Sequence, residues 1–379
     1  MKVDLRITGG TLIDPGRGLH GPGEVLISGN RIVGPSQGDA VEAERILDAE
    51  GCLVFPGLIY FHAHLFAGGN EIGIHPDSSL LPMGITTAVD AGSCGTANYE
   101  SFLRTIVPTS RVRIFSLLNV CPAGLITSRY LEETDPRYYD EAGIAELFSR
   151  NPGQLLGLKI RQSKEIVGEL GTKPLEATVE IARRMNCPVV VHTTNPPVPV
   201  EKLISMLRPG DVYCHVHHGT GESIINASGK VWPAMYDAQK AGIIFDAANG
   251  RNHFVSGVAE RALAQGFFPD VISSDVTAKT VYGDFVFSLP YVMMKYLNLG
   301  MELDRVVAAC TSVPARLIGW SGKIGTLAPG AFADVAVFRL VQKPITIRDN
   351  FGGKITGDKW LIPQFTILDG RIAYRQIDF

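Results

Sequence analysis

The chain has 379 residues, 45% of them hydrophobic, and its 35 Lys and Arg nearly balance 38 Asp and Glu, for a net charge of −3. This length suits one barrel-sized domain and a smaller one. The balanced charge, with neither a basic block nor a membrane-length apolar run, argues against nucleic acid or a membrane as partner and favours a small-molecule substrate.

The start of the chain has no charged segment followed by an apolar one, so a secretory leader is not expected and a cytoplasmic location is predicted. Six cysteines are scattered singly, without any CxxC pair. In a chain of this size they indicate reduced thiols rather than a disulfide framework. The sequence allows a homo-oligomer without specifying one.

Segments near both ends alternate apolar and polar residues around Gly and Asn turns, as half-buried antiparallel strands do. They are residues 3–8, 24–33, 332–338, 364–370 and 371–376. Because the two groups flank a long middle region, they predict one small β-sandwich built from residues 1–54 and 322–379. The middle, residues 55–321, is then a separate domain.

Eight short apolar runs recur in this middle region, and segments able to form helices separate them. The runs are residues 57–64, 86–92, 112–120, 155–160, 188–194, 211–216, 242–249 and 270–276, and the clearest helical segments are 175–185, 200–207 and 258–266. Alternating strands and helices predict a parallel α/β fold, and eight strands close a (β/α)₈ barrel. The alternative is an open doubly wound sheet, but no GxGxxG motif follows the first run.

Polar residues close five of the eight runs. Barrel active sites lie at the carboxyl ends of the strands, so these residues should meet on one rim. His62 and His64 are two apart and share a face of their strand. Imidazole and carboxylate are common ligands of zinc, so the pattern predicts a metal site. The candidate ligands are His62, His64, Lys159, His192, His215 and Asp275.

Lys159 is unexpected in this set, because an ammonium group would repel a cation. Burial would favour the neutral amine, which can add CO₂ to form a carbamate, in effect a carboxylate able to bridge two ions. Cys94 is an alternative extra ligand, since a thiolate suits zinc. The position of Lys159 at the end of a regular strand favours the lysine, which leaves Cys94 as a pocket-wall residue.

The HAH pair after PGLI, the GLKI lysine, the two strand-end histidines and the Asp of ISSDV together resemble the amidohydrolase superfamily of binuclear metallohydrolases. The flanks GGTLIDPGRG, TSVPARLIG and GKIGTLAPGAFADVAVF are similar to that family too. The resemblance implies two divalent ions, expected to be Zn²⁺. It assigns one ion to His62, His64 and Asp275, the other to His192 and His215, and the bridge to carboxylated Lys159.

Within this superfamily, VDAGS, GLKI and HVHHG resemble a branch related to dihydroorotases and D-aminoacylases, which includes deacetylases. Three positions depart from the pattern. Tyr60 stands where relatives carry an Asp, so that carboxylate is absent or replaced. Phe66 stands where dihydroorotases carry an Arg for the substrate carboxylate, which argues against that substrate. Cys94 matches a metal-ligating cysteine of D-aminoacylases.

These features predict hydrolysis of an acyl, expected to be acetyl, ester or amide of a small carboxylic acid. A hydroxide shared by the two ions would attack the carbonyl, with Asp275 as general acid and base. Arg161 and Arg251 are candidates for holding the substrate carboxylate, and His218 for lining the pocket. Alternatives are an adenine-type deaminase, a cyclic-amide hydrolase and a non-enzymatic scaffold; the complete ligand set disfavours the scaffold.

Overall fold

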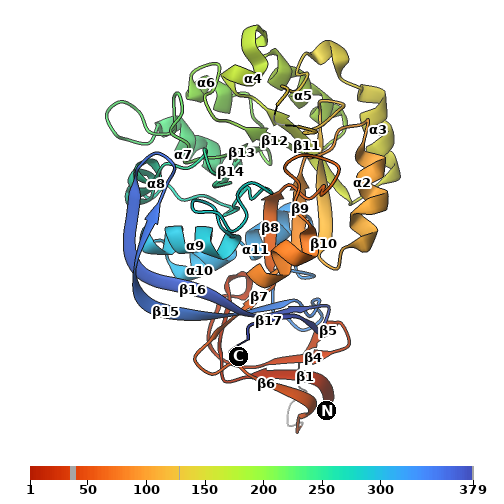
Figure 1. Cartoon of the computed structure of the whole chain (residues 1–379), viewed down its shortest axis with the longest axis vertical. Helices are drawn as coiled ribbons and strands as arrows, with labels where there is room; N and C mark the ends of the chain where they lie inside the picture. The colour runs from red at the N-terminus through yellow and green to blue at the C-terminus, as the bar shows by residue number, and fades with distance from the viewer. Residues whose placement is uncertain (35–39, 128, 378–379) are drawn as a thin grey trace.

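The computed structural model describes residues 1–34, 40–127 and 129–377; residues 35–39, 128 and 378–379, which fall within the predicted domain ranges, lie outside the described part. The described residues form sheets of seven, six and four strands (Figure 1). No helix among them combines the length and apolar character that a membrane span requires.

The seven-stranded sheet is parallel, and strands consecutive in the chain are neighbours in it. Figure 1 shows it curled, with helices around its outside. Both faces are covered, which explains why its strands read as apolar runs rather than alternating ones. The strands are β8 (Leu58–Ala63), β9 (Ile85–Ala91), β10 (Arg113–Asn119), β11 (Leu155–Arg161), β12 (Val189–His192), β13 (Val212–Cys214) and β14 (Ile244–Asp246).

The eighth apolar run, residues 270–276, follows the edge of β14 without forming a regular strand. Val271 makes a parallel bridge to Asp246, and the amide of Asn249 donates to the carbonyl of Ser273 at 3.0 Å. The backbone of Asp275 then turns into the left-handed region, at φ 49°, which ends any strand geometry. The fold class is therefore confirmed, while the eighth element is less regular than predicted.

Tyr60 connects this eighth run to the first strand, β8. Its buried hydroxyl accepts a hydrogen bond from the amide of Val276 at 2.7 Å and hydrogen-bonds with the hydroxyl of Ser274. The residue that departs from the family pattern thus links β8, at one edge of the curled sheet, to the eighth run, which lies beside β14 at the other edge.

Helices follow the strands as the alternating pattern predicts. In α5 (Lys173–Arg184), Leu175, Val179 and Ala182 are buried at helical spacing, and Pro174 lies in the first turn. The others are α1 (Pro76–Leu80), α2 (Tyr99–Thr105), α3 (Glu141–Arg150), α4 (Lys164–Val167), α6 (Val200–Ile204), α7 (Pro233–Lys240), α8 (Ser256–Ala264), α9 (Leu289–Asn298), α10 (Leu303–Ala308) and α11 (Ser312–Leu317), with 3₁₀ turns at Pro15–Arg17, Leu81–Met83, Val107–Thr109, Pro136–Tyr138 and Gly168–Leu170.

The two remaining sheets pack around an apolar core that includes Ile7, Ile27, Val54, Val335 and Ile367, so both ends of the chain contribute. One sheet, in the order β5-β4-β1-β6, contains β1 (Lys2–Thr8), β4 (Val25–Ser28), β5 (Arg31–Val33) and β6 (Glu42–Asp48). The other, β17-β16-β15-β7-β2-β3, contains β2 (Thr11–Asp14), β3 (Leu19–Pro22), β7 (Leu53–Pro56), β15 (Val335–Arg348), β16 (Lys354–Leu368) and β17 (Arg371–Arg375).

The long hairpin β15–β16 extends beyond this β region along the side of the helices (Figure 1). Asn298, at the end of α9, donates to the carbonyl of Lys359 at 2.9 Å. Asp349, in the hairpin turn, accepts from both the amide and the hydroxyl of Ser256 at 2.7 Å. The hairpin therefore ties the terminal β region to the helices α8 and α9.

Candidate metal centre

Polar residues at the carboxyl ends of the parallel strands surround one cavity. Its lining comprises His62, His64, Ile72, Leu125, Thr127, Lys159, Arg161, His192, His253, Asp275 and Thr277. Five of the six predicted ligands are among these residues. The sixth, His215, is not part of the lining but lies next to His192, with the two ring centroids 4.3 Å apart.

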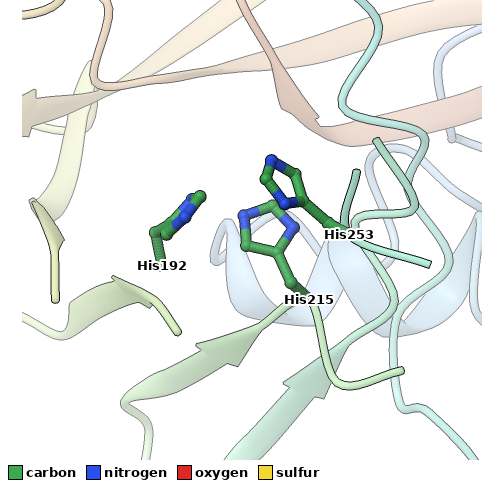
Figure 2. A group of neighbouring side chains, drawn as sticks. All are labelled: His192, His215 and His253. Atoms are coloured by element: carbon green, nitrogen blue, oxygen red, sulfur yellow. The ribbon is translucent and has the colours of Figure 1, made fainter. Parts of the chain in front are cut away.

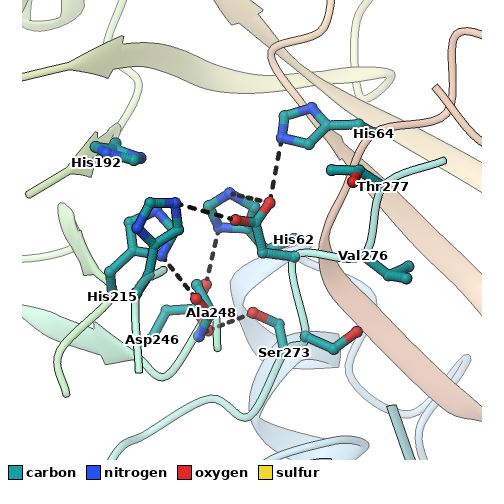
Figure 3. Close-up of polar contacts among 12 residues, drawn as sticks. His62, His64, His192, His215, Asp246, Ala248, Ser273, Val276 and Thr277 are labelled. Atoms are coloured by element: carbon teal, nitrogen blue, oxygen red, sulfur yellow. Dashed lines mark hydrogen bonds and ion pairs between the residues drawn. The ribbon is translucent and has the colours of Figure 1, made fainter. Parts of the chain in front are cut away.

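His62 and His64 project from the end of β8 toward Asp275. The Nε2 atoms of the two histidines lie 3.8 and 3.3 Å from Asp275 Oδ1 (Figure 3). Burial lowers the pKa of His62, so its imidazole is neutral and able to ligate a metal. Burial opposes ionisation of Asp275, but the hydrogen bond with His64 and the other nearby imidazoles outweigh it and hold the pKa of Asp275 well below its usual range.

Each of these two histidines has its other ring nitrogen fixed by the protein. His62 Nδ1 donates to Asp246 Oδ2 at 3.2 Å, and His64 Nδ1 donates to the Ser93 hydroxyl at 3.1 Å. Ser93 in turn donates to Asp90 at 2.7 Å. Such partners orient metal-ligating histidines and select the tautomer with a free Nε2. Asp246 is thus the carboxylate that supports His62, while Tyr60 contacts Ser274 and Val276 instead.

His192 and His215 also have one ring nitrogen held by the protein, Nε2 in His192 and Nδ1 in His215. His215 Nδ1 donates to the carbonyl of Ala248 at 2.6 Å, and His192 Nε2 lies 2.9 Å from the hydroxyl of Thr194. Burial lowers the pKa of both imidazoles well below the usual value. His215 Nε2 is buried and has no hydrogen-bond partner in the described part of the chain. A buried nitrogen of this kind, with its lone pair unused by the protein, fits a metal ligand.

Lys159 is buried at the end of β11, with 1% of its surface exposed, and its Nζ lies 3.2 Å from His62 Nε2. Gly92 packs directly against it: a Cβ on this glycine would lie 2.5 Å from the Lys159 Cβ, and its φ is 77°. The space beside the lysine is therefore available only because residue 92 has no side chain.

The remaining predicted residues lie in different places. Arg161 lines the cavity, whereas Arg251 lines a separate pocket with Lys279, Asp284 and Phe285. Cys94 is buried outside the cavity lining, and burial raises the pKa of its thiol. His218 is also buried; its Nδ1 bonds the carbonyl of Thr220 at 3.1 Å, and burial lowers its pKa to about 4.

His253 also lines the cavity, although it was not among the predicted ligands or substrate-binding residues. It follows β14, and Figure 2 shows its ring beside those of His192 and His215. Gly250 begins a turn just before His253 with φ 50°, and a Cβ on Gly250 would lie 2.5 Å from the His253 ring. Two residues away, Arg251 faces the other pocket. Only the geometry of the turn sends Arg251 and His253 to different pockets, and the sequence does not show it. The position of a histidine shortly after a strand was the one feature that could have indicated His253.

The donor set suits a divalent metal. Possible ligand atoms within 4.8 Å of one another occur in the groups His62–His215–Asp275, His192–His215–His253 and His62–Cys214–Asp246. The last group is less suitable, because Asp246 already accepts hydrogen bonds from Ser273 and the amide of Ala248, and burial raises the pKa of the Cys214 thiol. Zinc prefers neutral imidazoles and ionised carboxylates as ligands. The cavity offers both, including imidazole nitrogens that have no hydrogen-bond partner among the described residues.

Replacing Asp246 with Asn is expected to weaken metal binding about 10- to 100-fold. Asp246 accepts hydrogen bonds from His62, Ser273 and the amide of Ala248, and an amide side chain cannot accept all three and still orient His62. Competition with a chelator would measure the change in metal affinity. Asp211→Asn is the matched control: Asp211 is equally buried but lies at the opposite end of its strand, where it bonds Arg208 and the amide of Val189. Wild-type metal affinity in Asp246→Asn would contradict the supporting role.

Comparisons with known proteins agree with this geometry. Residues 170–372 match the model of a family described as the amidohydrolase family. A protein named deacetylase from Agrobacterium fabrum is 32% identical over 351 residues, covering 92% of this chain and 84% of that protein. A solved structure named a dihydroorotase has 29% identity and a TM-score of 0.88, covering 97% of this chain and 98% of that one. Another, named an adenine deaminase, has 26% identity and a TM-score of 0.90, covering 99% and 100%.

Proposed function

This chain belongs to the amidohydrolase family, and we propose that it removes an acyl group, expected to be acetyl, from a small molecule that bears a carboxylate. The observation that carries the proposal is one cavity lined by residues able to ligate a metal and by a guanidinium, that of Arg161. The deacetylase name of the relative from Agrobacterium fabrum supports the same class of reaction.

We assign two divalent ions, with Zn²⁺ as the expected metal, to this cavity. His62, His64 and Asp275 would hold one ion, His192 and His215 the other, and Lys159, carrying CO₂ as a carbamate on Nζ, would contribute to both. The metal would polarise the substrate carbonyl and lower the pKa of a water molecule. The imidazoles of His62, His192 and His215 can ligate at neutral pH because burial lowers their pKa and keeps them uncharged.

Asp275 is the residue placed to transfer the proton. As the oxygen of the attacking water bonds to the acyl carbon, one Asp275 oxygen accepts the proton that water loses. When the bond from that carbon to the leaving oxygen or nitrogen breaks, Asp275 returns the proton to the leaving atom. The products are the carboxylic acid of the acyl group and a hydroxy or amino acid.

Of the residues proposed for substrate binding, Arg161 is favoured over Arg251. Arg161 lines the metal-site cavity, whereas Arg251 would reach only a substrate that extends into the neighbouring pocket. Cys94 and His218 are buried behind the cavity wall, so we propose that they shape it without contacting substrate.

A substrate panel tests the proposal. Purified protein loaded with zinc or manganese in the presence of CO₂ should contain about two ions per chain and hydrolyse one or more acetylated hydroxy or amino acids. The panel should also contain adenine and cyclic imides. Ammonia release from adenine, with no turnover of any acylated acid, would replace the proposal with a deaminase; turnover of cyclic imides alone would indicate a cyclic-amide hydrolase.

A further inference from the structure

His253 differs from the four predicted histidine ligands in how its ring is held. His62, His64, His192 and His215 each have one nitrogen fixed by a protein group, which leaves the other for a metal. Neither nitrogen of His253 makes a hydrogen bond within the described ranges, and its Nδ1 is buried. Because metal-ligating histidines almost always have the second nitrogen supported, this ring is not prepared as a ligand.

The position of His253 indicates a different role. It lines the cavity with Arg161, and its Nε2 lies 3.9 Å from Asp275 Oδ2, beyond hydrogen-bonding distance. Its ring has no hydrogen-bond partner on either nitrogen within the described residues, lines the same cavity as the Arg161 cation and has Nε2 near the proposed proton carrier, which suits a hydrogen bond to a bound substrate.

Arg161 is held in place from behind. Its Nη1 donates to Glu132 Oε2 at 2.9 Å, and only 4% of the Glu132 side chain is exposed. The other oxygen of Glu132 accepts from Asn119 Nδ2 at 3.1 Å, and Asn119 also donates to the carbonyl of Gly92 at 3.2 Å. Glu132 is therefore fixed to the end of β10. Glu132 accepts a hydrogen bond from Nη1 of the guanidinium, while the N–H groups on its other nitrogens make no hydrogen bond within the described residues.

We infer that His253 and Arg161 together form a subsite for the substrate carboxylate, and that Glu132 is a positioning residue that orients Arg161 toward it. The inference rests on the proposed function. Glu132 offsets the charge of Arg161, so the subsite carries no excess positive charge. It therefore recognises the substrate carboxylate by the number and direction of the hydrogen-bond donors on Arg161 and His253. A neutral substrate would leave these donors unpaired, which a site built around hydrogen bonds penalises strongly.

The test compares an acetylated hydroxy acid with its methyl ester, which lacks the negative charge. In His253→Ala and Glu132→Ala, the ratio of kcat/KM for the acid to that for the ester should fall roughly 10- to 100-fold, mainly through KM. His253→Asn should recover part of the loss, because its amide can donate. Both His253 variants should keep the metal content of the wild type. Arg251→Ala is the matched control and should leave the ratio unchanged.

Loss of an ion from His253→Ala would overturn the inference and make His253 a ligand. An unchanged ratio in His253→Ala and Glu132→Ala would also overturn it while leaving the proposed function in place. If the wild type hydrolyses no acylated acid, the proposed function fails instead. Calorimetry with lactate then tests the subsite independently: weaker binding by both alanine variants than by the wild type supports it, and equal binding refutes it.

Discussion

Lys159→Ala is expected to bind about one divalent ion per chain instead of two and to lose about 100-fold or more of its turnover. The residue is buried at the centre of the ligand set, with its Nζ 3.2 Å from His62 Nε2. Removing the support of a ligand alone costs 10- to 100-fold, so removing a bridging ligand should cost at least as much. Elemental analysis together with kcat measures both effects.

Cys94→Ser is the control that separates the two candidates for the extra ligand. Cys94 lies outside the cavity lining and burial raises the pKa of its thiol, so the serine variant should retain both ions. A short carboxylic acid added to Lys159→Ala should restore part of the activity by occupying the place of the carbamate. Full metal content in Lys159→Ala with loss of an ion from Cys94→Ser would reverse the assignment.

The fold could be predicted from the sequence because strand burial leaves a direct trace in it. Strands covered on both faces read as apolar runs, and seven of the eight runs became strands of the parallel sheet. The eighth run carries the same apolar signal, but the left-handed backbone at Asp275 and the side-chain link through Tyr60 are tertiary features. No local pattern reveals them. The predicted enzyme family is confirmed by the comparisons.

The sequence located the candidate ligands better than the groups that support them. His62, His64 and Lys159 stand at the ends of runs, where period and position suffice to bring them together. Asp246 lies within the run 242–249, at the end of the observed strand β14, and it serves as the partner of His62 rather than lining the cavity. Sequence position alone does not separate these two roles.

Residues in the loops were harder to find. Glu132 approaches Arg161 only through the long connection after β10, which has no periodicity to interpret. The orientations of Arg251 and His253 depend on the turn at Gly250, where φ is 50°. Loop residues of this kind carry much of the specificity of barrel enzymes, while the strands supply their positions.

Asp275→Asn tests the proposed proton carrier without removing its side chain. Asparagine tolerates the left-handed backbone at this position, where φ is 49°, and retains one oxygen that can face His62 and His64. The variant should therefore keep most of its metal. It cannot accept and return a proton, so kcat should fall by about 10² to 10⁴, the usual contribution of general acid–base catalysis.

Elemental analysis and kcat, measured on the same preparation, distinguish this effect from loss of metal. Asp275→Ala should lose an ion as well as turnover, because it removes the ligand atom entirely. A fall in kcat for Asp275→Asn that is matched by the loss of an ion would make Asp275 a ligand alone. Turnover within about threefold of the wild type, with both ions bound, would assign the proton transfer to another group, since no carboxylate would remain at position 275 to accept it.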